Sequence, residues 1–267
     1  MKTIILCGGQ GTRIRDVSSN LPKPMIPIGN RPIIWHIMKY YATYGHKEFV
    51  LCLGYLGDLI RDFFMNYESH TCDTRVTLGK QRRIEFINQH DEADWEVTLA
   101  ETGQDSMTGA RIRKVRQYIG DDENFMLTYG DGVGDIDLDA LLAFHKKHGK
   151  IMTVTGVHPP GRFGEMRCDA NGLVSGFNEK PQVSSGCISG GYFVCRRELF
   201  DYLDFFNGRD DLVFEQEPMN RLVADQQMMV YKHAGFWQPM DTHREYLLLN
   251  KLYENKKAPW MKWDEVE

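Results

Sequence analysis

Short apolar runs alternate with helix-like segments along most of this chain. The runs that predict strands are residues 2–6, "EFVLCLGY", "WEVTLAE", "NFMLTYG" and "IMTVTGV". Several of them are apolar at nearly every position, as strands are when helices cover both faces of a parallel sheet. The alternation therefore predicts an α/β fold with a mostly parallel central sheet flanked by helices.

Two helices can be placed from the spacing of their side chains. Asn30 followed by Pro32 indicates a helix cap and first turn. The face that this helix would bury carries Ile33, Ile34, Ile37, Met38 and Tyr41. A second helix is expected near residues 58–67, where the side chains expected to point inward are Leu59, Ile60, Phe63 and Phe64.

A length of 267 residues suits one large α/β domain. After about residue 160 the predicted strands are "LVSGF" and "ISGGYFVC", and helices are expected near 197–206 and 241–255. We therefore expect a single domain over 1–267 with parts at approximately 1–158, 159–240 and 241–267, the last being a small C-terminal helical extension.

Charge and apolar content argue against two classes of partner. The net charge is −5 without a long basic block, which argues against a protein that neutralises many nucleic-acid phosphates. The first apolar run is too short for a signal peptide, and no later run approaches the roughly 20 residues of a membrane span. We therefore expect a cytoplasmic protein with no nucleic-acid or membrane partner.

Scattered cysteines without a CxxC pair predict free buried thiols at Cys7, Cys52, Cys72, Cys168, Cys187 and Cys195.

The first apolar run leads directly into "CGGQGTRIR", residues 7–15. A Walker loop requires Lys and then Ser or Thr after its last glycine, but Thr12 and Arg13 follow Gly11. A dinucleotide loop requires a small residue where Ile14 stands. The loop is therefore either one that approaches a phosphate or a base closely, or a simple tight turn.

Positive charges accompany this glycine loop. Arg13 and Arg15 carry donors that suit phosphate oxygens. Further along, "LPKPM" holds Lys23 between two prolines, which restrict the backbone on either side. A lysine on a stiff loop can present its charge to an anion, so we interpret the two segments as a candidate anion site.

An aspartate follows another of the apolar strands. Asp131 in "TYGDGVGD" is flanked by glycines, at the edge of the sheet where ligands bind, although aspartate is also an ordinary turn residue. A nucleotide enzyme commonly holds Mg²⁺ through one or two carboxylates together with substrate phosphates. Asp241 in "FWQPMDTHRE" precedes the last predicted helix, where aspartate is an ordinary N-cap.

"GGQGTRIR" followed by "PKPM" resembles the signature of the sugar-phosphate nucleotidyltransferases, which join a nucleoside triphosphate to a sugar 1-phosphate. The segments "TGQDSMTGARIRKV", "YGDGV", "PPGRFG", "EKP", "FWQPMDT" and "KAPW" narrow the resemblance to the branch of cytidylyltransferases that act on glucose 1-phosphate. The resemblance covers nearly the whole chain. It implies a Rossmann-like nucleotidyltransferase fold, in which 1–158 binds the nucleotide and 159–240 the sugar phosphate.

The resemblance also implies roles for individual residues. Asp131 and Asp241 would hold Mg²⁺, and Arg13 and Lys23 would be catalytic. Residues implied at the sugar phosphate are Glu179 and Lys180, with Arg162 in reach of the same pocket. Residues implied at the nucleotide are Leu6, Cys7, Gly8, Gly9, Gln10, Gly11, Thr12, Arg13, Lys23, Ser106, Arg111 and Gly130.

The reaction implied by the resemblance transfers a cytidylyl group from CTP to α-D-glucose 1-phosphate and yields CDP-glucose and pyrophosphate. The attacking phosphate is largely dianionic near neutral pH, so no general base is required. The resemblance also implies a homo-oligomer. Two alternatives stay open from the sequence: a thymidylyl- or uridylyltransferase, since backbone groups can read a base edge, and a non-catalytic nucleotide-sugar-binding regulatory protein.

Overall fold

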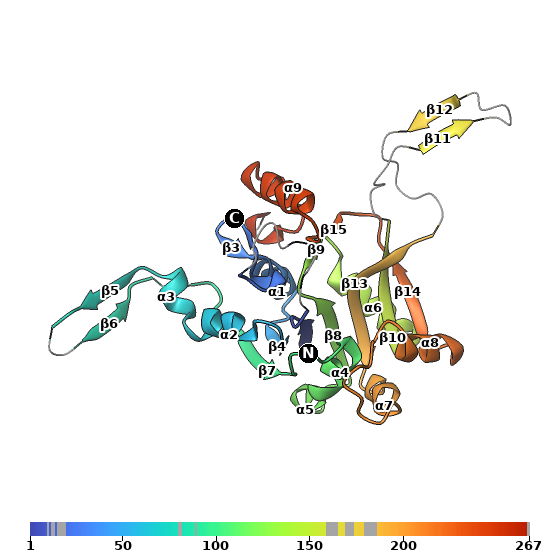
Figure 1. The fold of residues 1–267 in the computed structure, drawn as a ribbon, viewed down its shortest axis with the longest axis horizontal. Coiled ribbons are helices and arrows are strands. Elements are labelled where there is room, and N and C mark those ends of the chain that lie inside the picture. Colours follow the sequence, from blue (N-terminus) through green and yellow to red (C-terminus); the bar gives the residue numbers. More distant parts are fainter. Residues whose placement is uncertain are drawn as a thin grey trace.

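A seven-stranded sheet with the order β14-β10-β13-β8-β1-β4-β7 forms the centre of the computed structural model (Figure 1). The structure describes residues 1–9, 11, 14, 20–79, 82–88, 90–158 and 186–265, together with the backbone of 165–168 and 174–178. The strands of the sheet are β1 (Thr3–Leu6), β4 (Glu48–Leu53), β7 (Glu96–Glu101), β8 (Asn124–Tyr129), β10 (Met152–Val157), β13 (Ile188–Arg196) and β14 (Met228–Lys232).

Most neighbouring strands of this sheet run parallel. β1 pairs in parallel with both β4 and β8, β4 pairs in parallel with β7, and β10 with β14. Within the described part of the chain, β13 alone in this sheet runs against its neighbours, β8 and β10. The predicted α/β fold with a mostly parallel sheet is therefore confirmed, and all five apolar runs that predicted it form strands of this sheet.

Helices cover both faces of the sheet because successive side chains of each strand point to opposite faces. Ile5 and Leu51 belong to one hydrophobic core, whereas Ile4 and Val50 belong to the other. The helices that contribute to the first core are α1 (Ile33–Thr43), α2 (Gly57–Met65), α6 (Leu138–His148) and α9 (His243–Glu254). Those of the second core are α4 (Thr108–Lys114), α5 (Arg116–Ile119), α7 (Leu199–Asp204) and α8 (Glu217–Ala224). This layering leaves the loops at the carboxyl ends of the strands available for a ligand site.

The remaining elements are short. They are α3 (Tyr67–Thr71), the 3-10 helices η2 (Lys23–Met25) and η3 (Lys262–Glu265), and the paired strands β2 (Pro27–Ile28) with β3 (Arg31–Pro32), β5 (Thr74–Thr77) with β6 (Arg83–Phe86), β9 (Gly132–Gly134) with β15 (Trp237–Pro239), and β11 (Glu165–Cys168) with β12 (Val174–Asn178). None of the helices in the described ranges has the length and the apolar run needed to cross a membrane.

Three predicted details are wrong. The N-cap of α1 is Pro32, without a side-chain cap, because Asn30 lies in the turn that joins β2 to β3. The predicted second helix is divided at Asn66 into α2 and α3, and Leu59 is 38% exposed instead of pointing inward. The five cysteines whose side chains the structure describes are free, but Cys187 is exposed and Cys72 is only partly buried. The side chain of Cys168 lies outside the described part of the structure.

A buried histidine fastens the C-terminal segment to α1. Nε2 of His36 lies 3.0 Å from the carbonyl oxygen of Ile28, and its Nδ1 accepts a hydrogen bond of 3.3 Å from Nε1 of Trp260. Both His36 and Trp260 are fully buried. The neutral ring with its proton on Nε2 satisfies both contacts, so a second proton would displace the tryptophan. Burial lowers the pKa of His36 to about 4.

Acid should weaken the fold through His36. Its folded pKa of about 4 lies below the ordinary value of about 6.5, so the unfolded chain binds the extra proton between these two pH values. The contribution is complete above about pH 6.5 and is lost as the pH falls toward 4, with a slope of up to about 1.4 kcal/mol per pH unit. Urea unfolding of the parent and of His36→Gln between pH 7 and pH 4.5 measures this slope.

The free energy of unfolding should depend less steeply on pH in His36→Gln than in the parent. A matched control is His243→Gln, which replaces an exposed histidine on α9 and should keep the parent's slope. Equal slopes in the parent and in His36→Gln would contradict the assignment.

Candidate active site

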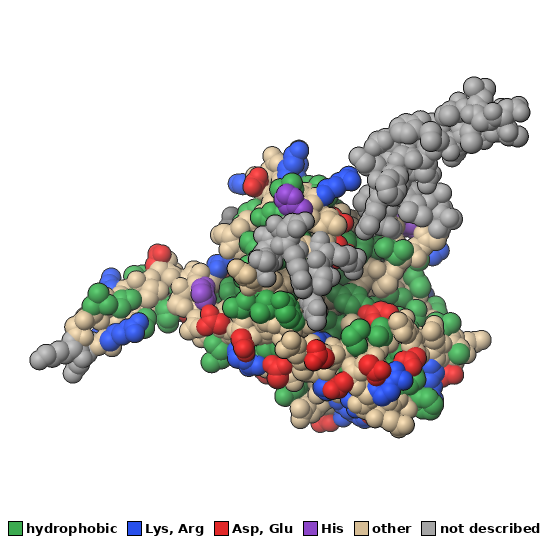
Figure 2. Space-filling model, in the orientation of Figure 1, with side chains coloured by type: hydrophobic (Ala, Val, Ile, Leu, Met, Phe, Trp, Pro, Cys, Tyr) green, Lys and Arg blue, Asp and Glu red, His purple; other side chains and the backbone are tan. Residues whose placement is uncertain are grey.

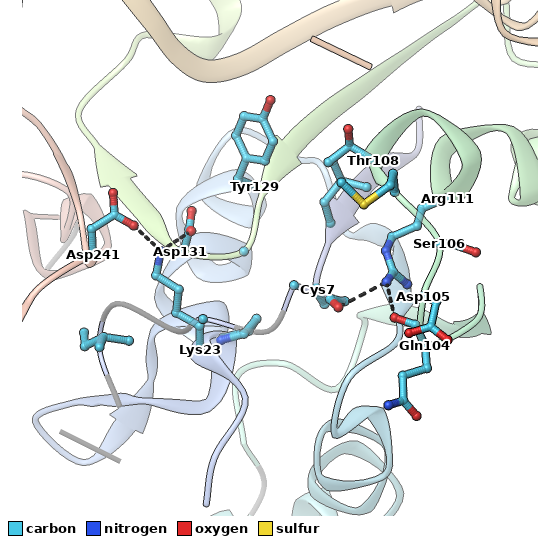
Figure 3. Close-up of a pocket in the computed structure, with 18 residues that line it drawn as sticks. Cys7, Lys23, Gln104, Asp105, Ser106, Thr108, Arg111, Tyr129, Asp131 and Asp241 are labelled. Carbon is cyan, nitrogen blue, oxygen red and sulfur yellow. Dashed lines mark hydrogen bonds and ion pairs between the residues drawn. The ribbon is translucent and has the colours of Figure 1, made fainter. Parts of the chain in front are cut away.

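A cavity of about 540 Å³ opens at the carboxyl ends of β1 and β8 (Figure 3). Its walls come from the loop after β1, from η2, from the segment between β7 and α4, and from the turn after β8. The residues that line it are Leu6, Cys7, Gly8, Gly9, Gly11, Ile14, Lys23, Pro24, Gln104, Asp105, Ser106, Met107, Thr108, Arg111, Tyr129, Gly130, Asp131 and Asp241. The cavity therefore joins the glycine loop, Lys23 and both candidate carboxylates in one place.

Lys23 lies between the two aspartates of this cavity (Figure 3). Its Nζ is 2.5 Å from Oδ2 of Asp131 and also donates to Oδ1 of Asp241. The side chain of Lys23 is only 12% exposed, and those of Asp131 and Asp241 are 32% and 21% exposed. Two carboxylates from distant parts of the sequence thus converge on one point.

A short ladder explains why these two carboxylates meet. β9 begins directly after Asp131 and pairs antiparallel with β15, so that Gly132 lies opposite Pro239. The N–H of Met240 then donates to the carbonyl oxygen of Asp131 at 2.8 Å. This pairing sets the backbones side by side and brings Asp241 to the turn that holds Asp131.

The environment keeps Lys23 charged. Burial by itself lowers the pKa of an amine, but the charges and hydrogen bonds of Asp131 and Asp241 act in the opposite direction and outweigh it. The net pKa of Lys23 is raised. The ammonium group of Lys23 therefore stays positively charged near neutral pH, beside the turn that follows β8.

Asp241 is not the N-cap of the last helix. That position is taken by Thr242, whose hydroxyl accepts from the N–H of Glu245 while the Glu245 carboxylate accepts from the N–H of Thr242, a capping box. The N–H of Asp241 also donates to Glu245 at 2.8 Å. The helix start thus fixes the backbone of Asp241, while its carboxylate is directed to Lys23.

The donors at this point suit a divalent cation that substrate oxygens help to hold. Asp131 and Asp241 each supply a carboxylate oxygen to the same small volume, which is the type of ligand that Mg²⁺ accepts. Among the described residues there is no group of three or more His, Cys, Asp or Glu side chains that could hold a metal ion. Phosphate oxygens and water would have to complete such a shell.

Two glycines of the cavity lie in close packing, which is tightest at Gly8. A Cβ on Gly8 would lie 2.2 Å from the guanidinium of Arg111. A Cβ on Gly130 would lie 3.1 Å from the carbonyl oxygen of Leu6, because the N–H of Gly130 donates to that oxygen at 3.0 Å. A Cβ on Gly9, in contrast, would meet no atom within 4 Å. Gly8 and Gly130 therefore serve the packing of the walls, and Gly9 leaves its side of the loop open toward a ligand.

Arg111 lines the cavity, and both terminal nitrogens of its guanidinium bind groups of the cavity walls. Nη1 donates to the carbonyl oxygens of Leu53 and Gly103 and to the hydroxyl of Thr102, at 2.7 to 2.9 Å. Nη2 donates to the carbonyl oxygens of Gly8 and Gln104, both at 3.1 Å. Burial lowers the pKa of the guanidinium.

Ser106 is similarly engaged within the wall. It is 5% exposed, and its hydroxyl donates to the carbonyl oxygen of Thr102 at 2.7 Å and accepts from Nζ of Lys114 at 2.8 Å. Both Arg111 and Ser106 thus border the cavity with their hydrogen-bonding groups turned to the protein.

Several predicted site residues cannot be placed. Those outside the described residues are Gln10, Thr12, Arg13, Arg162, Glu179 and Lys180. Their predicted roles at the phosphates and the sugar therefore stay predictions.

Part of the cavity wall was not predicted from the sequence, including Gln104, Asp105, Met107, Thr108 and Tyr129. Signals for them were present. Tyr129 is the last residue of a predicted strand, directly before Gly130, and the others lie in the segment that follows β7. Because ligands bind at the carboxyl ends of such strands, each of these positions was a candidate by location alone.

Two solved structures illustrate the similarity of the fold. HddC from Yersinia pseudotuberculosis has a TM-score of 0.65 at 19% identity, with 94% of this chain and 99% of that chain covered. A UDP-glucose pyrophosphorylase complexed with UDP-glucose has a TM-score of 0.67 at 15% identity, with coverage of 96% and 98%. At these identities the similarity shows the fold.

Sequence relatives are considerably more similar. A glucose-1-phosphate cytidylyltransferase of Salmonella typhi is 45% identical over 264 residues, which cover 99% of this chain and 100% of that protein. A probable glucose-1-phosphate cytidylyltransferase of Bacillus subtilis is 41% identical over 266 residues, with coverage of 98% and 100%. The model of the nucleotidyl transferase family matches residues 2–256. The chain therefore belongs to the nucleotidyl transferase family.

Proposed function

We propose that this protein transfers a cytidylyl group from CTP to α-D-glucose 1-phosphate, giving CDP-glucose and pyrophosphate. One observation carries the proposal. The carboxylates of Asp131 and Asp241 converge on Lys23 at the mouth of a glycine-lined cavity, in a chain with full-length identity of 45% to a glucose-1-phosphate cytidylyltransferase. This arrangement suits a substrate that carries both a base and several phosphates.

The chemistry requires alignment and charge, but no general base. A phosphate oxygen of the sugar 1-phosphate forms a bond to the α-phosphorus of CTP, and the bond from that phosphorus to the oxygen of the departing pyrophosphate breaks. The attacking group is already largely dianionic near neutral pH, so the protein has no proton to remove from it. What the chain supplies is a fixed position for both reactants and preorganised charge.

Asp131 and Asp241 are the residues we assign to Mg²⁺, which would neutralise phosphate charge when it is bound. Lys23, whose raised pKa keeps it cationic, is assigned to the phosphate oxygens. Losing one such preorganised charge usually costs on the order of 100-fold in rate. Lys23 already contacts both carboxylates, so the three side chains are close enough to act on one phosphate group.

Other assignments extend the proposal beyond the described residues. Gln10, Thr12 and Arg13 are assigned to the phosphates, with Arg13 catalytic, and Glu179 with Lys180 to the sugar phosphate. The nucleotide part is then 1–158 and the sugar-phosphate part 159–240, followed by the helical extension 241–267. We assign the reaction to the cytoplasm, because the described cysteines are free thiols, as is usual in a reducing compartment.

We further propose that the protein assembles as a homo-oligomer through the β5–β6 arm, residues 74–87. The arm projects from the body of the molecule, and apolar side chains are visible along it (Figures 1 and 2). Its exposed apolar residues are Val76, Leu78, Ile84, Phe86 and Ile87, and Leu78 is 88% exposed. A two-stranded hairpin with this surface is marginal on its own, so it favours a partner that covers it.

A groove at the base of the arm has a surface that suits the arm of a second copy. This groove of about 360 Å³ is lined by Phe64, Tyr67 and Trp95, with the exposed Glu68 at its edge and the buried Glu92, which pairs with Lys39, in its wall. The arm itself carries exposed basic side chains, at Arg75, Arg82 and Arg83. An apolar, basic arm and an apolar, acidic groove are complementary, so we assign a second copy of this chain as the partner.

Replacing one metal ligand should abolish turnover without unfolding the protein. Asp131→Asn keeps the size of the side chain but removes the charge assigned to Mg²⁺, and we expect at least a 100-fold fall in pyrophosphate release. Pyrophosphate release is measured with CTP, glucose 1-phosphate and Mg²⁺, and circular dichroism follows the fold. Asp139→Asn, at an exposed position on α6, is the control and should behave as the parent. Parent-like release by Asp131→Asn would overturn the metal assignment.

The base and the sugar can be identified with a substrate panel. CTP, dTTP and UTP are each combined with several sugar 1-phosphates, and pyrophosphate release is followed. We expect the highest kcat/KM for CTP with glucose 1-phosphate. A higher kcat/KM with dTTP or UTP would show that the enzyme selects thymine or uracil instead of cytosine. Tight nucleotide binding without turnover on any pair would instead indicate a regulatory protein.

Charging the arm should reduce the size of the assembly. Leu78→Glu combined with Ile84→Glu places carboxylates on the apolar arm, opposite the acidic groove, and should shift the protein to smaller species. Light scattering after size exclusion measures the mass of parent and variant. Val223→Glu combined with Leu247→Glu, at exposed apolar positions outside the arm, is the matched control and should retain the mass of the parent. A parent that is monomeric at all concentrations would rule out the assembly.

A further inference from the structure

A carboxylate outside the cavity joins two of its walls. The hydroxyl of Tyr129 donates to Oε1 of Glu215, and the hydroxyl of Thr108 donates to Oε2 at 2.6 Å. Tyr129 and Thr108 both line the cavity, whereas Glu215 does not. One side chain therefore binds a hydroxyl from each wall.

The two walls belong to different parts of the site. Tyr129 ends β8, two residues before Asp131, and Thr108 begins α4. In Figure 3 the ring of Tyr129 stands between Asp131 on one side and Thr108 with Arg111 on the other. The bridge through Glu215 thus connects the wall beside the carboxylate pair to the wall beside Arg111.

The backbone around Glu215 is itself fixed to α4. The N–H groups of Met107 and Gly109 donate to the carbonyl oxygens of Asp210 and Leu212, at 2.8 and 2.9 Å. The N–H of Phe214 donates to the hydroxyl of Thr108 at 2.9 Å. The segment 210–215 thereby satisfies groups at the start of α4 that would otherwise have no partner within the helix. Glu215 consequently moves with α4, and its bond to Tyr129 is the connection to β8.

Neighbouring residues pack against the ring of Tyr129, which leaves its hydroxyl as the group that needs a hydrogen-bond partner. A Cβ on Gly191 would lie 2.4 Å from the ring, and Phe193 meets the ring edge-on with centroids 6.0 Å apart. The hydroxyl finds that partner in Glu215, to whose carboxylate it donates.

We propose that Glu215 is a positioning residue for the nucleotide: it sets the separation between Tyr129 and the start of α4, and so the width of the cavity that receives the triphosphate. This inference rests on the proposed nucleotidyl transfer. Hydrogen bonds to a charged carboxylate are strong. Because Glu215 holds both walls in place before the nucleotide binds, less conformational entropy is lost when the complex forms. Glu215 touches no substrate in this role and acts through Tyr129 and Thr108.

The experiment compares Glu215→Ala and Glu215→Gln with the parent, using the triphosphate that the parent prefers in the substrate panel. We expect Glu215→Ala to raise KM and Kd for that triphosphate about tenfold, the size of one strong hydrogen bond. KM for the sugar 1-phosphate should stay within about twofold of the parent. Glu215→Gln keeps one acceptor oxygen and should restore part of the affinity. Glu217→Gln, two positions along and paired with Arg209, is the matched control and should bind as the parent does.

A double-mutant cycle then tests the bridge. Tyr129→Phe removes one hydroxyl, and adding it to Glu215→Ala should weaken triphosphate binding no further, because its partner is already absent. Tyr129→Phe and Thr108→Val also serve if Glu215→Ala does not fold. Parent-like triphosphate binding in Glu215→Ala, a change confined to the melting temperature, or additive losses in the cycle would each overturn the inference. A parent that turns over no triphosphate would refute the proposed function instead, and calorimetric Kd values would still test the bridge.

Discussion

The buried guanidinium of Arg111 is the contact on which the cavity depends. The end of β4 and the loops after β1 and β7 meet at the same end of the sheet. Each of them directs a backbone carbonyl oxygen toward the guanidinium of Arg111. Arg111 collects these oxygens with both terminal nitrogens. The cost of burying a cation is offset by hydrogen bonds to every loop, instead of by one carboxylate. The packing leaves no space for a Cβ at Gly8 or at Gly54, where it would lie 2.2 or 2.3 Å from the guanidinium. The glycines of the first loop are thus explained in part by an arginine far along the chain.

A second constraint places the charges opposite this arginine. β9 and β15 form only a short ladder, but both aspartates lie just beyond its end, where Gly132 pairs with Pro239. The ladder joins the turn after β8 to the start of α9, whose own first turn is fixed by the capping box of Thr242 and Glu245. The backbones of both aspartates are therefore positioned by strand pairing and helix capping, and their carboxylates meet at Lys23. Such a frame can hold two like charges close together, which free side chains would avoid.

Much of the fold follows from local patterns in the sequence. Apolar runs such as those of β1 and β8 identify buried strands, and the rule for parallel sheets locates Asp131 at the ligand edge before any contact is known. Lys23 could be singled out because its two prolines restrict the loop. The antiparallel direction of β13 could not be predicted, because an isolated apolar run carries no sign of strand direction. The role of Asp241 could be proposed only from the family resemblance. In the sequence it occupies an ordinary helix-cap position, and the β9–β15 pairing that brings it to Asp131 is visible only in the structure.

The contacts that escaped prediction are those made between polar side chains distant in sequence. Tyr129 and Glu215 lie 86 positions apart, and nothing in either segment indicates the other. The same limit applies to Lys23, whose environment is defined by residues 108 and 218 positions away. Its ammonium is buried at a cost that both carboxylates offset, so removing either one leaves a buried charge with half of its compensation. Lys23, Asp131 and Asp241 consequently act as one unit. Substitutions among them should be strongly non-additive, because the first already removes contacts of the buried ammonium that all three side chains share.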